Sequence, residues 1–171
     1  MKKIWLFALV LTIMWACRTK EESSPMVEAA VTEIQGGEWP RPVSIKEDPM
    51  EILKAWPEFM DLQASFESLY TVGNREDLSL VVENLIEKQK LLEKSTYPEE
   101  FNLSQIKGRQ KVFKTFCLKV KGHLGHDLEI QEPVSQMIEA YNALRNQFNV
   151  VFNNKLDKKL LEIDEIDEVV E

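Results

Sequence analysis

Apolar residues recur at intervals of three and four positions through most of the chain beyond residue 47, which is the period of an amphipathic α-helix. Four such segments are separated by short stretches that contain helix-breaking residues. No stretch shows a convincing alternation of apolar and polar residues, the pattern of a half-buried β-strand. These patterns predict an all-α fold, an antiparallel (up-down) four-helix bundle formed by residues 48–160.

The predicted helix boundaries rest on residues that start or stop a helix. Asp48 is placed to cap the first segment, and Glu51 closes a capping box three residues later. Pro57 lies inside the first apolar pattern and should kink the helix or restart it, because proline has no backbone N–H to donate. Gly73 marks the end of this segment, and Asn74 is a fresh N-cap for the next. A tight turn should therefore join the first two helical segments.

The first sixteen residues have the layout of a signal peptide. Two lysines after Met1 are followed by an apolar run over residues 4–15 that is interrupted only by Thr12. A run of about a dozen residues is too short to cross a bilayer, which needs roughly 20. Met14-Trp15-Ala16-Cys17 resembles a lipobox, in which a small residue precedes the acceptor cysteine. This resemblance implies cleavage before Cys17 and its lipidation; the alternative is an ordinary secretory signal cleaved at the same bond.

The residues after Cys17 bear on the location of the protein. Lys20-Glu21-Glu22 is similar to the export signal of surface lipoproteins in Bacteroidetes, and a charged linker is the alternative interpretation. Arg18 is not the aspartate that is associated with retention in the inner membrane. We therefore expect a lipid anchor in the outer membrane of the cell envelope, with the protein facing either the periplasm or the outside of the cell.

Segments at both ends of the predicted bundle differ from it. Residues 17–47 contain three prolines and the pair Gly36-Gly37, so we expect the lipidated cysteine to be followed by a flexible, extended tether. Residues 161–171 form an acidic, amphipathic tail that either extends the last helix or frays. The predicted organisation is thus a signal peptide over residues 1–16, the tether, the bundle and the tail.

Net charge disfavours one class of partner. The chain has 21 Lys and Arg against 29 Asp and Glu, a net charge of −8, and removal of Lys2 and Lys3 with the signal peptide leaves 19 against 29, or −10. Nucleic-acid binding needs a basic surface that meets the phosphate backbone, so we expect no nucleic-acid partner. Hydrophobic residues make up 44% of the chain, which is enough for a packed core.

A basic pattern on the third predicted helix is one candidate partner surface. Its four lysines recur at helical spacing: Lys107, Lys111, Lys114 and Lys121. In an acidic protein such a face can meet an acidic protein, an anionic lipid or a surface polysaccharide. In the alternative interpretation, the face is solvated and paired with glutamates of the second helix or of the acidic tail.

An asparagine pattern on the fourth predicted helix is a second candidate surface. Its members lie on one face of that helix: Asn142, Asn146, Asn149 and Asn153. Asparagine is a mediocre helix former, so four on one face call for a reason. They contact a partner or a sugar, form hydrogen bonds between helices, or are simply exposed.

The chain offers few residues for metal, cofactor or catalytic chemistry. His123 and His126, its two histidines, are weak candidates for a metal site, but they lie beside glycines at a predicted helix end, where ligands are poorly held. The Glu-x-x-His pairs of di-iron bundles and the Cys-x-x-Cys-His motif of c-type haem are both missing, so we expect neither metal nor cofactor. We also find no nucleophile motif and no phosphate-binding glycine loop, and expect no catalytic residues and no enzyme. Cys117 lies within an apolar pattern and is expected to be a buried, small apolar side chain.

A family resemblance covers residues 98–152. It is carried by Pro98-Glu99-Glu100-Phe101-Asn102, Ile106-Lys107-Gly108-Arg109-Gln110 and Ala140-Tyr141-Asn142-Ala143-Leu144-Arg145-Asn146, which resemble small Bacteroidetes lipoproteins with a helical-bundle domain. The resemblance implies a fold and a location and brings no functional residues with it. Our first hypothesis is a membrane-anchored, non-enzymatic interaction or structural module with a protein or polysaccharide partner. The alternative is a carrier that binds a small ligand or metal inside the bundle or at its His123–His126 end.

Overall fold

The computed structural model describes residue 34 and residues 39–169, with side chains through residue 155. Every regular element in this part is a helix, so the prediction of an all-α fold is confirmed there. The helices are α2 (Glu47–Lys54), α3 (Pro57–Glu67), α4 (Arg75–Lys94), α5 (Ser104–Gly125) and α6 (Gln131–Val169), with short 3₁₀ helices η2 (Ser68–Thr71) and η3 (Glu99–Phe101). The predicted signal peptide, Cys17 and the predicted export signal lie outside the described residues.

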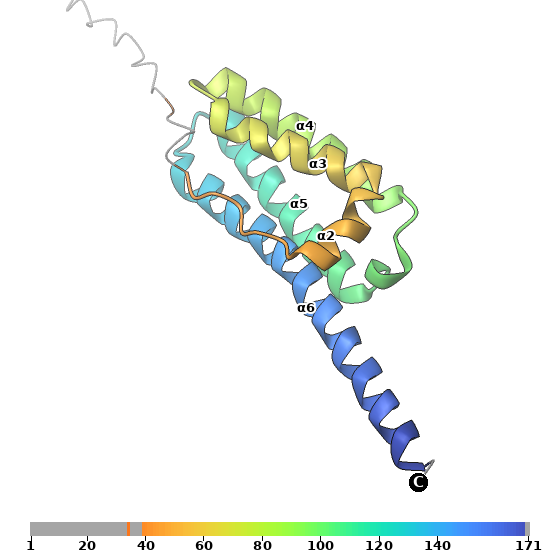
Figure 1. Ribbon diagram of the computed structural model, residues 1–171. Coiled ribbons are helices and arrows are strands. Elements are labelled where there is room, and N and C mark those ends of the chain that lie inside the picture. The colour runs from red at the N-terminus through yellow and green to blue at the C-terminus, as the bar shows by residue number, and fades with distance from the viewer. Residues whose placement is uncertain (1–33, 35–38, 170–171) are drawn as a thin grey trace, which may run out of the picture. The chain divides into compact units, whose positions relative to one another are not determined.

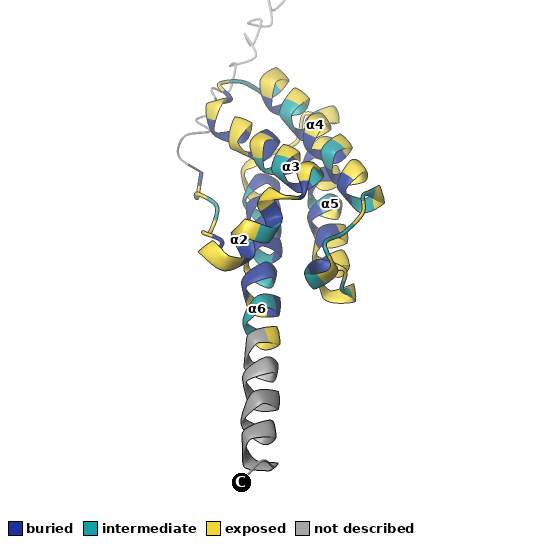
Figure 2. Cartoon of the chain, turned by 45° about the vertical axis from the view of Figure 1, so that its right-hand side comes forward, coloured by how far each residue is buried: buried dark blue, intermediate teal, exposed yellow. Residues whose placement is uncertain are grey.

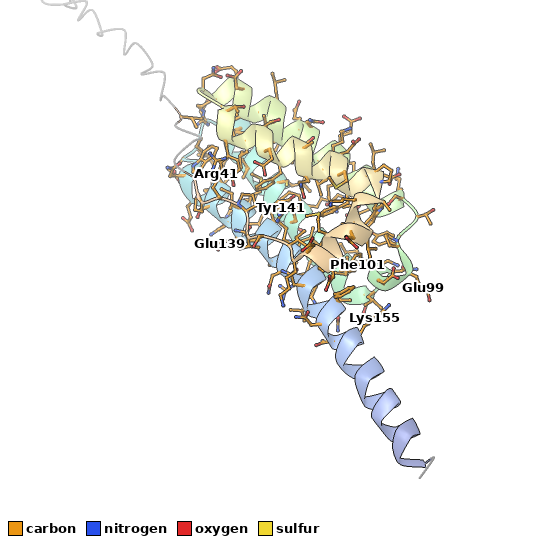
Figure 3. The ribbon with its side chains drawn as sticks, viewed as in Figure 1. Arg41, Glu99, Phe101, Glu139, Tyr141 and Lys155 are labelled. Carbon is orange, nitrogen blue, oxygen red and sulfur yellow. The ribbon has the colours of Figure 1, made fainter. Side chains whose placement is uncertain are left out.

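Helices that follow one another along the chain pack side by side: α3 against α4, α4 against α5, and α5 against α6 (Figure 1). Aromatic side chains also bring α3 to α6. Phe66 stacks on Tyr141 with ring centroids 3.8 Å apart, and Phe59 meets Phe148 edge to face at 5.1 Å. Tyr141 lies among the helices in Figure 3. Within the described residues, no helix combines the length and the apolar character needed to cross a membrane.

The core consists of the inward faces of these helices, and buried and exposed positions recur along each of them in Figure 2. Its largest fully buried side chains are mostly aromatic: Trp56, Phe59, Phe66, Phe101, Phe113, Tyr141 and Phe148. Cys117 is fully buried among these helices, as its apolar pattern predicts, and burial raises the pKa of its thiol. A buried thiol with a raised pKa is a packing residue, because only the thiolate is reactive.

Two of the predicted boundaries are confirmed and one is wrong. Pro57 restarts the helix, since α2 ends at Lys54 and α3 begins at the proline itself. Asn74 caps α4, because its Oδ1 accepts the backbone N–H of Asp77 at 2.8 Å. Asp48 caps nothing: α2 already includes Glu47, and its N-cap residue makes no side-chain bond. The acidic side chains of that first turn instead lie where they complement the positive end of the helix dipole.

The packed region begins earlier than residue 48. Residues 39–46, which we call the strap, were expected to belong to a flexible tether, but they lie extended along α6 (Figure 1). Two apolar side chains give the physical reason: Trp39 is 6% exposed and Ile45 is 9% exposed. At the other end of the chain, α6 continues through Val169, so residues 161–169 extend the last helix.

Candidate functional site

The most extensive polar interface among the described residues joins the strap to α6. Asn142 Oδ1 accepts the backbone N–H of Val43 at 2.9 Å, and Arg145 Nε donates to the Val43 carbonyl at 2.6 Å. Asn149 Oδ1 accepts the N–H of Lys46 at 2.9 Å. These three α6 residues are spaced by three and four positions, which places them on one face of the helix. They supply hydrogen bonds to an extended backbone that has no neighbouring strand to pair with.

The strap is also held at its beginning. Trp39 Nε1 donates to Gln131 Oε1 at 3.2 Å, at the start of α6. The hydroxyl of Tyr70, in η2, donates to the Pro40 carbonyl at 2.7 Å, and the Arg41 guanidinium lies 4.1 Å from the centre of the Tyr70 ring. The strap therefore contacts two elements, α6 and η2, along its length.

Arg145 is the charged residue at the centre of this interface and is only 7% exposed. Its described partners are all neutral oxygens: the Val43 carbonyl, Gln63 Oε1 at 3.1 Å and the Tyr141 hydroxyl at 3.5 Å. A buried guanidinium needs such partners because losing its hydration is costly. The strap provides the shortest of the three bonds, so docking of the strap and burial of this charge depend on each other.

Two tyrosines beside the strap keep their protons in this environment. Burial raises the pKa of Tyr70 to about 12, with Glu67 adding to the effect and Arg41 opposing it. Burial likewise raises the pKa of Tyr141 to about 12, against the opposing charge of Arg145. The Tyr70 hydroxyl is therefore a stable donor to the Pro40 carbonyl at neutral pH.

The structure separates the four asparagines that the sequence grouped. Asn142 and Asn149 bind the strap, and Asn149 also donates to the Ser44 carbonyl at 3.3 Å. Asn146 is exposed and Asn153 is half-buried; neither side chain forms a hydrogen bond with another described residue. Two of the four asparagines thus bind a segment of their own chain.

The lysine face is divided in a similar way. Lys114 pairs with Glu93 at 2.7 Å and Lys121 pairs with Glu83 at 2.9 Å, so both are neutralised by α4. Lys107 and Lys111 form no ion pair with any carboxylate in the described part of the chain. They lie closer to the start of α5, where the α4–α5 loop crosses the end of the helices.

The two histidines lie apart from any larger set of ligands. His123, in the last turn of α5, has its Nδ1 2.6 Å from the Glu129 carbonyl oxygen in the α5–α6 loop. His126 is exposed at the C-cap of α5. Among the described residues, no group of three or more His, Cys, Asp and Glu side chains is close enough to hold a metal ion.

Comparison with known proteins yields no match to a protein-family model, a curated protein or a solved structure. The function must therefore be argued from the residues of this chain. Arg145, the central side chain of the strap interface, is not among the candidate site residues predicted from the sequence. Trp39 and Ile45 were the available signals, because large apolar residues in a proline-rich segment indicate a segment that packs on something.

Proposed function

We propose that the protein is a lipid-anchored, non-enzymatic interaction module of the cell envelope, built on an antiparallel four-helix bundle of α3, α4, α5 and α6. Contacts between successive helices, together with the α3–α6 aromatic pairs, support this bundle topology. The signal peptide pattern and the lipobox-like residues before Cys17 support the anchor.

The observation that carries this proposal is the point at which the chain before the strap contacts the helices. The backbone N–H of Ile34 donates to the Gly73 carbonyl at 3.1 Å, so the incoming chain meets the helices at the α3–α4 turn. Residues 18–33 are then the only link between Cys17 and the docked chain, and sixteen residues span at most about 55 Å. A link of this length would hold the helices within about 55 Å of the membrane surface.

The remaining exposed polar residues are where a partner would bind. Lys107, Lys111 and Asn146 belong to the two surfaces that the sequence identified, and in the structure they are exposed. The strap binds Asn142 and Asn149, and α4 pairs with Lys114 and Lys121. An acidic protein or polysaccharide of the envelope fits the exposed lysines.

The anchor is tested by expressing the full-length chain in a lipoprotein-processing bacterial host and supplying a clickable palmitate analogue. The native chain should be labelled and Cys17→Ser should not be. Cys117→Ala is the matched control, since it removes the other cysteine and should leave the label unchanged. Label on Cys17→Ser equal to that on the native chain would refute lipidation at this residue.

The interaction role is tested in the same cells with a photo-crosslinking residue at position 111 or 146. A discrete crosslinked species at either position, absent when the crosslinker replaces the buried Ile138, would support a partner at these faces. No adduct at either exposed position would contradict the interaction role.

A further inference from the structure

An open pocket lies where the end of α4 and the α4–α5 loop meet the first turns of α5. It has a cavity volume of about 530 Å³, and its lining includes Tyr97, Asn102, Lys107, Gln110 and Lys111. Pockets that hold small ligands are typically ~300–1,000 Å³, so this one has room for a molecule of monosaccharide size.

Gln110 is a lining residue of this pocket with an unsatisfied donor. The residue is fully buried, and its Oε1 accepts the Tyr97 hydroxyl at 2.5 Å. Its Nε2 has no hydrogen-bond partner among the described residues. Buried amide donors are nearly always paired, so an unpaired one beside a pocket indicates a group that a ligand acceptor can complete.

The charges around the pocket are predominantly positive in an otherwise acidic chain. Glu93 also lines it, but its carboxylate is held by Lys114 at 2.7 Å. Lys107 Nζ bonds to the neutral Asn102 Oδ1 at 2.6 Å and lies 5.0 Å from the centre of the Tyr97 ring. Neither Lys107 nor Lys111 pairs with a carboxylate in the part that the structure describes.

The start of α5 adds to the positive potential. Its N-cap, Leu103, offers no side-chain bond, and the first turn contains no acidic residue. The free backbone N–H groups of a helix N-terminus carry a partial positive charge. Together with the two lysines and the unsatisfied amide of Gln110, this end of α5 favours an anion in the pocket.

We propose that this pocket binds a hydroxylated carboxylate, such as a uronic acid, either as a free small molecule or as a residue of a polysaccharide. The carboxylate is recognised by Lys107, Lys111 and the Nε2 donor of Gln110, because an ionised carboxylate accepts several hydrogen bonds at once. Lys107 and Lys111 leave the pocket with a net positive charge, since Glu93 is already paired with Lys114. The polar rim at Thr96 and Asn102 faces the hydroxyl groups. This site does not depend on the lipid anchor.

The test follows the amide signals of the full-length protein in detergent by nuclear magnetic resonance during titration with galacturonate at millimolar concentrations. We expect saturable shifts at the Gln110 side-chain amide and at Tyr97. Galactose, which has the same ring without the carboxylate, should give no saturable shift. Equal shifts with galactose, or none with galacturonate, would overturn the proposal.

Variants distinguish this pocket from charge effects elsewhere. Lys107→Gln with Lys111→Gln should weaken galacturonate binding about tenfold or more. Lys119→Gln with Lys121→Gln, on the same helix but outside the pocket lining, should leave it unchanged, and an equal loss in this control would overturn the proposal. Gln110→Met should also weaken galacturonate binding. The unfolding temperature of this variant is measured in parallel to show that it folds. Tighter binding of oligogalacturonate than of the monosaccharide would identify a polysaccharide as the source of the ligand. Equal affinity per sugar residue would identify a free acid as the ligand.

Discussion

Two regions of the molecule bury polar side chains and treat them in opposite ways. At the strap interface, Arg145 and Asn149 are 7% and 9% exposed, and each is bonded to backbone groups more than 100 positions away in the sequence. On α4 and α5, Gln89 and Gln110 are fully buried, and three of their four amide atoms have no partner among the described residues. In the first region, buried polar groups specify a contact. In the second, buried amide atoms stay unpaired, which lowers the stability of the fold.

This difference indicates the role of the buried polar groups in each region. A buried polar group that is fully bonded favours one arrangement of the chain, since any other arrangement leaves it unpaired. The strap therefore docks in one register along α6. Unpaired amides lower stability without specifying a contact inside the chain, so they indicate either a ligand-binding position, as proposed for Gln110, or a position at which stability can be gained.

The largest effect is expected from Arg145→Met. Methionine keeps the length of the side chain and removes the bonds to Val43, Gln63 and Tyr141, so we expect a loss of about 2–3 kcal/mol in the free energy of unfolding by urea. Amide hydrogen exchange at Val43 and Lys46 should also become faster, because the strap loses its central contact. Arg41→Met is the control, since the guanidinium of Arg41 is exposed above the Tyr70 ring. A loss no larger than that of the control would show that the strap does not depend on Arg145.

A smaller loss, about 1–2 kcal/mol, is expected for Asn149→Ala, which removes two hydrogen bonds to the strap. Asn146→Ala is a closely matched control on the same helix, because Asn146 is exposed and alanine is the better helix former. It should change the unfolding free energy by less than ~0.5 kcal/mol. Calorimetry of both variants checks the pair, and equal losses would mean that Asn149 contributes only as a helix residue.

Much of the helical architecture could be predicted from the sequence because its signals act over a few residues. Pro57 interrupts the apolar pattern of the first segment and begins a new helix, α3. Asn74 bonds to the backbone N–H of the residue three positions later. Asp48 does not cap α2 because the helix begins one residue before it, at Glu47, with Lys46 as the N-cap residue. The backbone N–H of Lys46 bonds to Asn149 of α6, a contact that no local pattern predicts.

The strap interface could not be predicted in this way. Its bonds join Val43 and Lys46 to residues of α6 that are about a hundred positions away, and an extended segment with several prolines has no period that shows which face it binds. The asparagine pattern includes Asn142 and Asn149, which bind the strap, but whether a partner or the chain itself covers them depends on tertiary packing. The pocket was not predicted either, although two of its lining residues, Lys107 and Lys111, belong to the predicted lysine face. The rest of its lining comes from the end of α4, the α4–α5 loop and the buried Gln110, which no local pattern brings together.

The smallest effect, and the one of opposite sign, is expected from Gln89→Leu. Both amide atoms of Gln89 are buried without a described partner, so an apolar side chain of similar size removes a desolvation cost and should raise the unfolding free energy by about 1 kcal/mol. Gln63→Leu is the matched control, because Gln63 accepts a bond from Arg145 and its loss should destabilise the protein. Urea unfolding of the two variants gives the comparison directly. The midpoint of unfolding should rise for Gln89→Leu and fall for Gln63→Leu. If Gln89→Leu were as destabilising as Gln63→Leu, the amide of Gln89 would be bonded in solution, and the contrast between the two regions would be lost for α4.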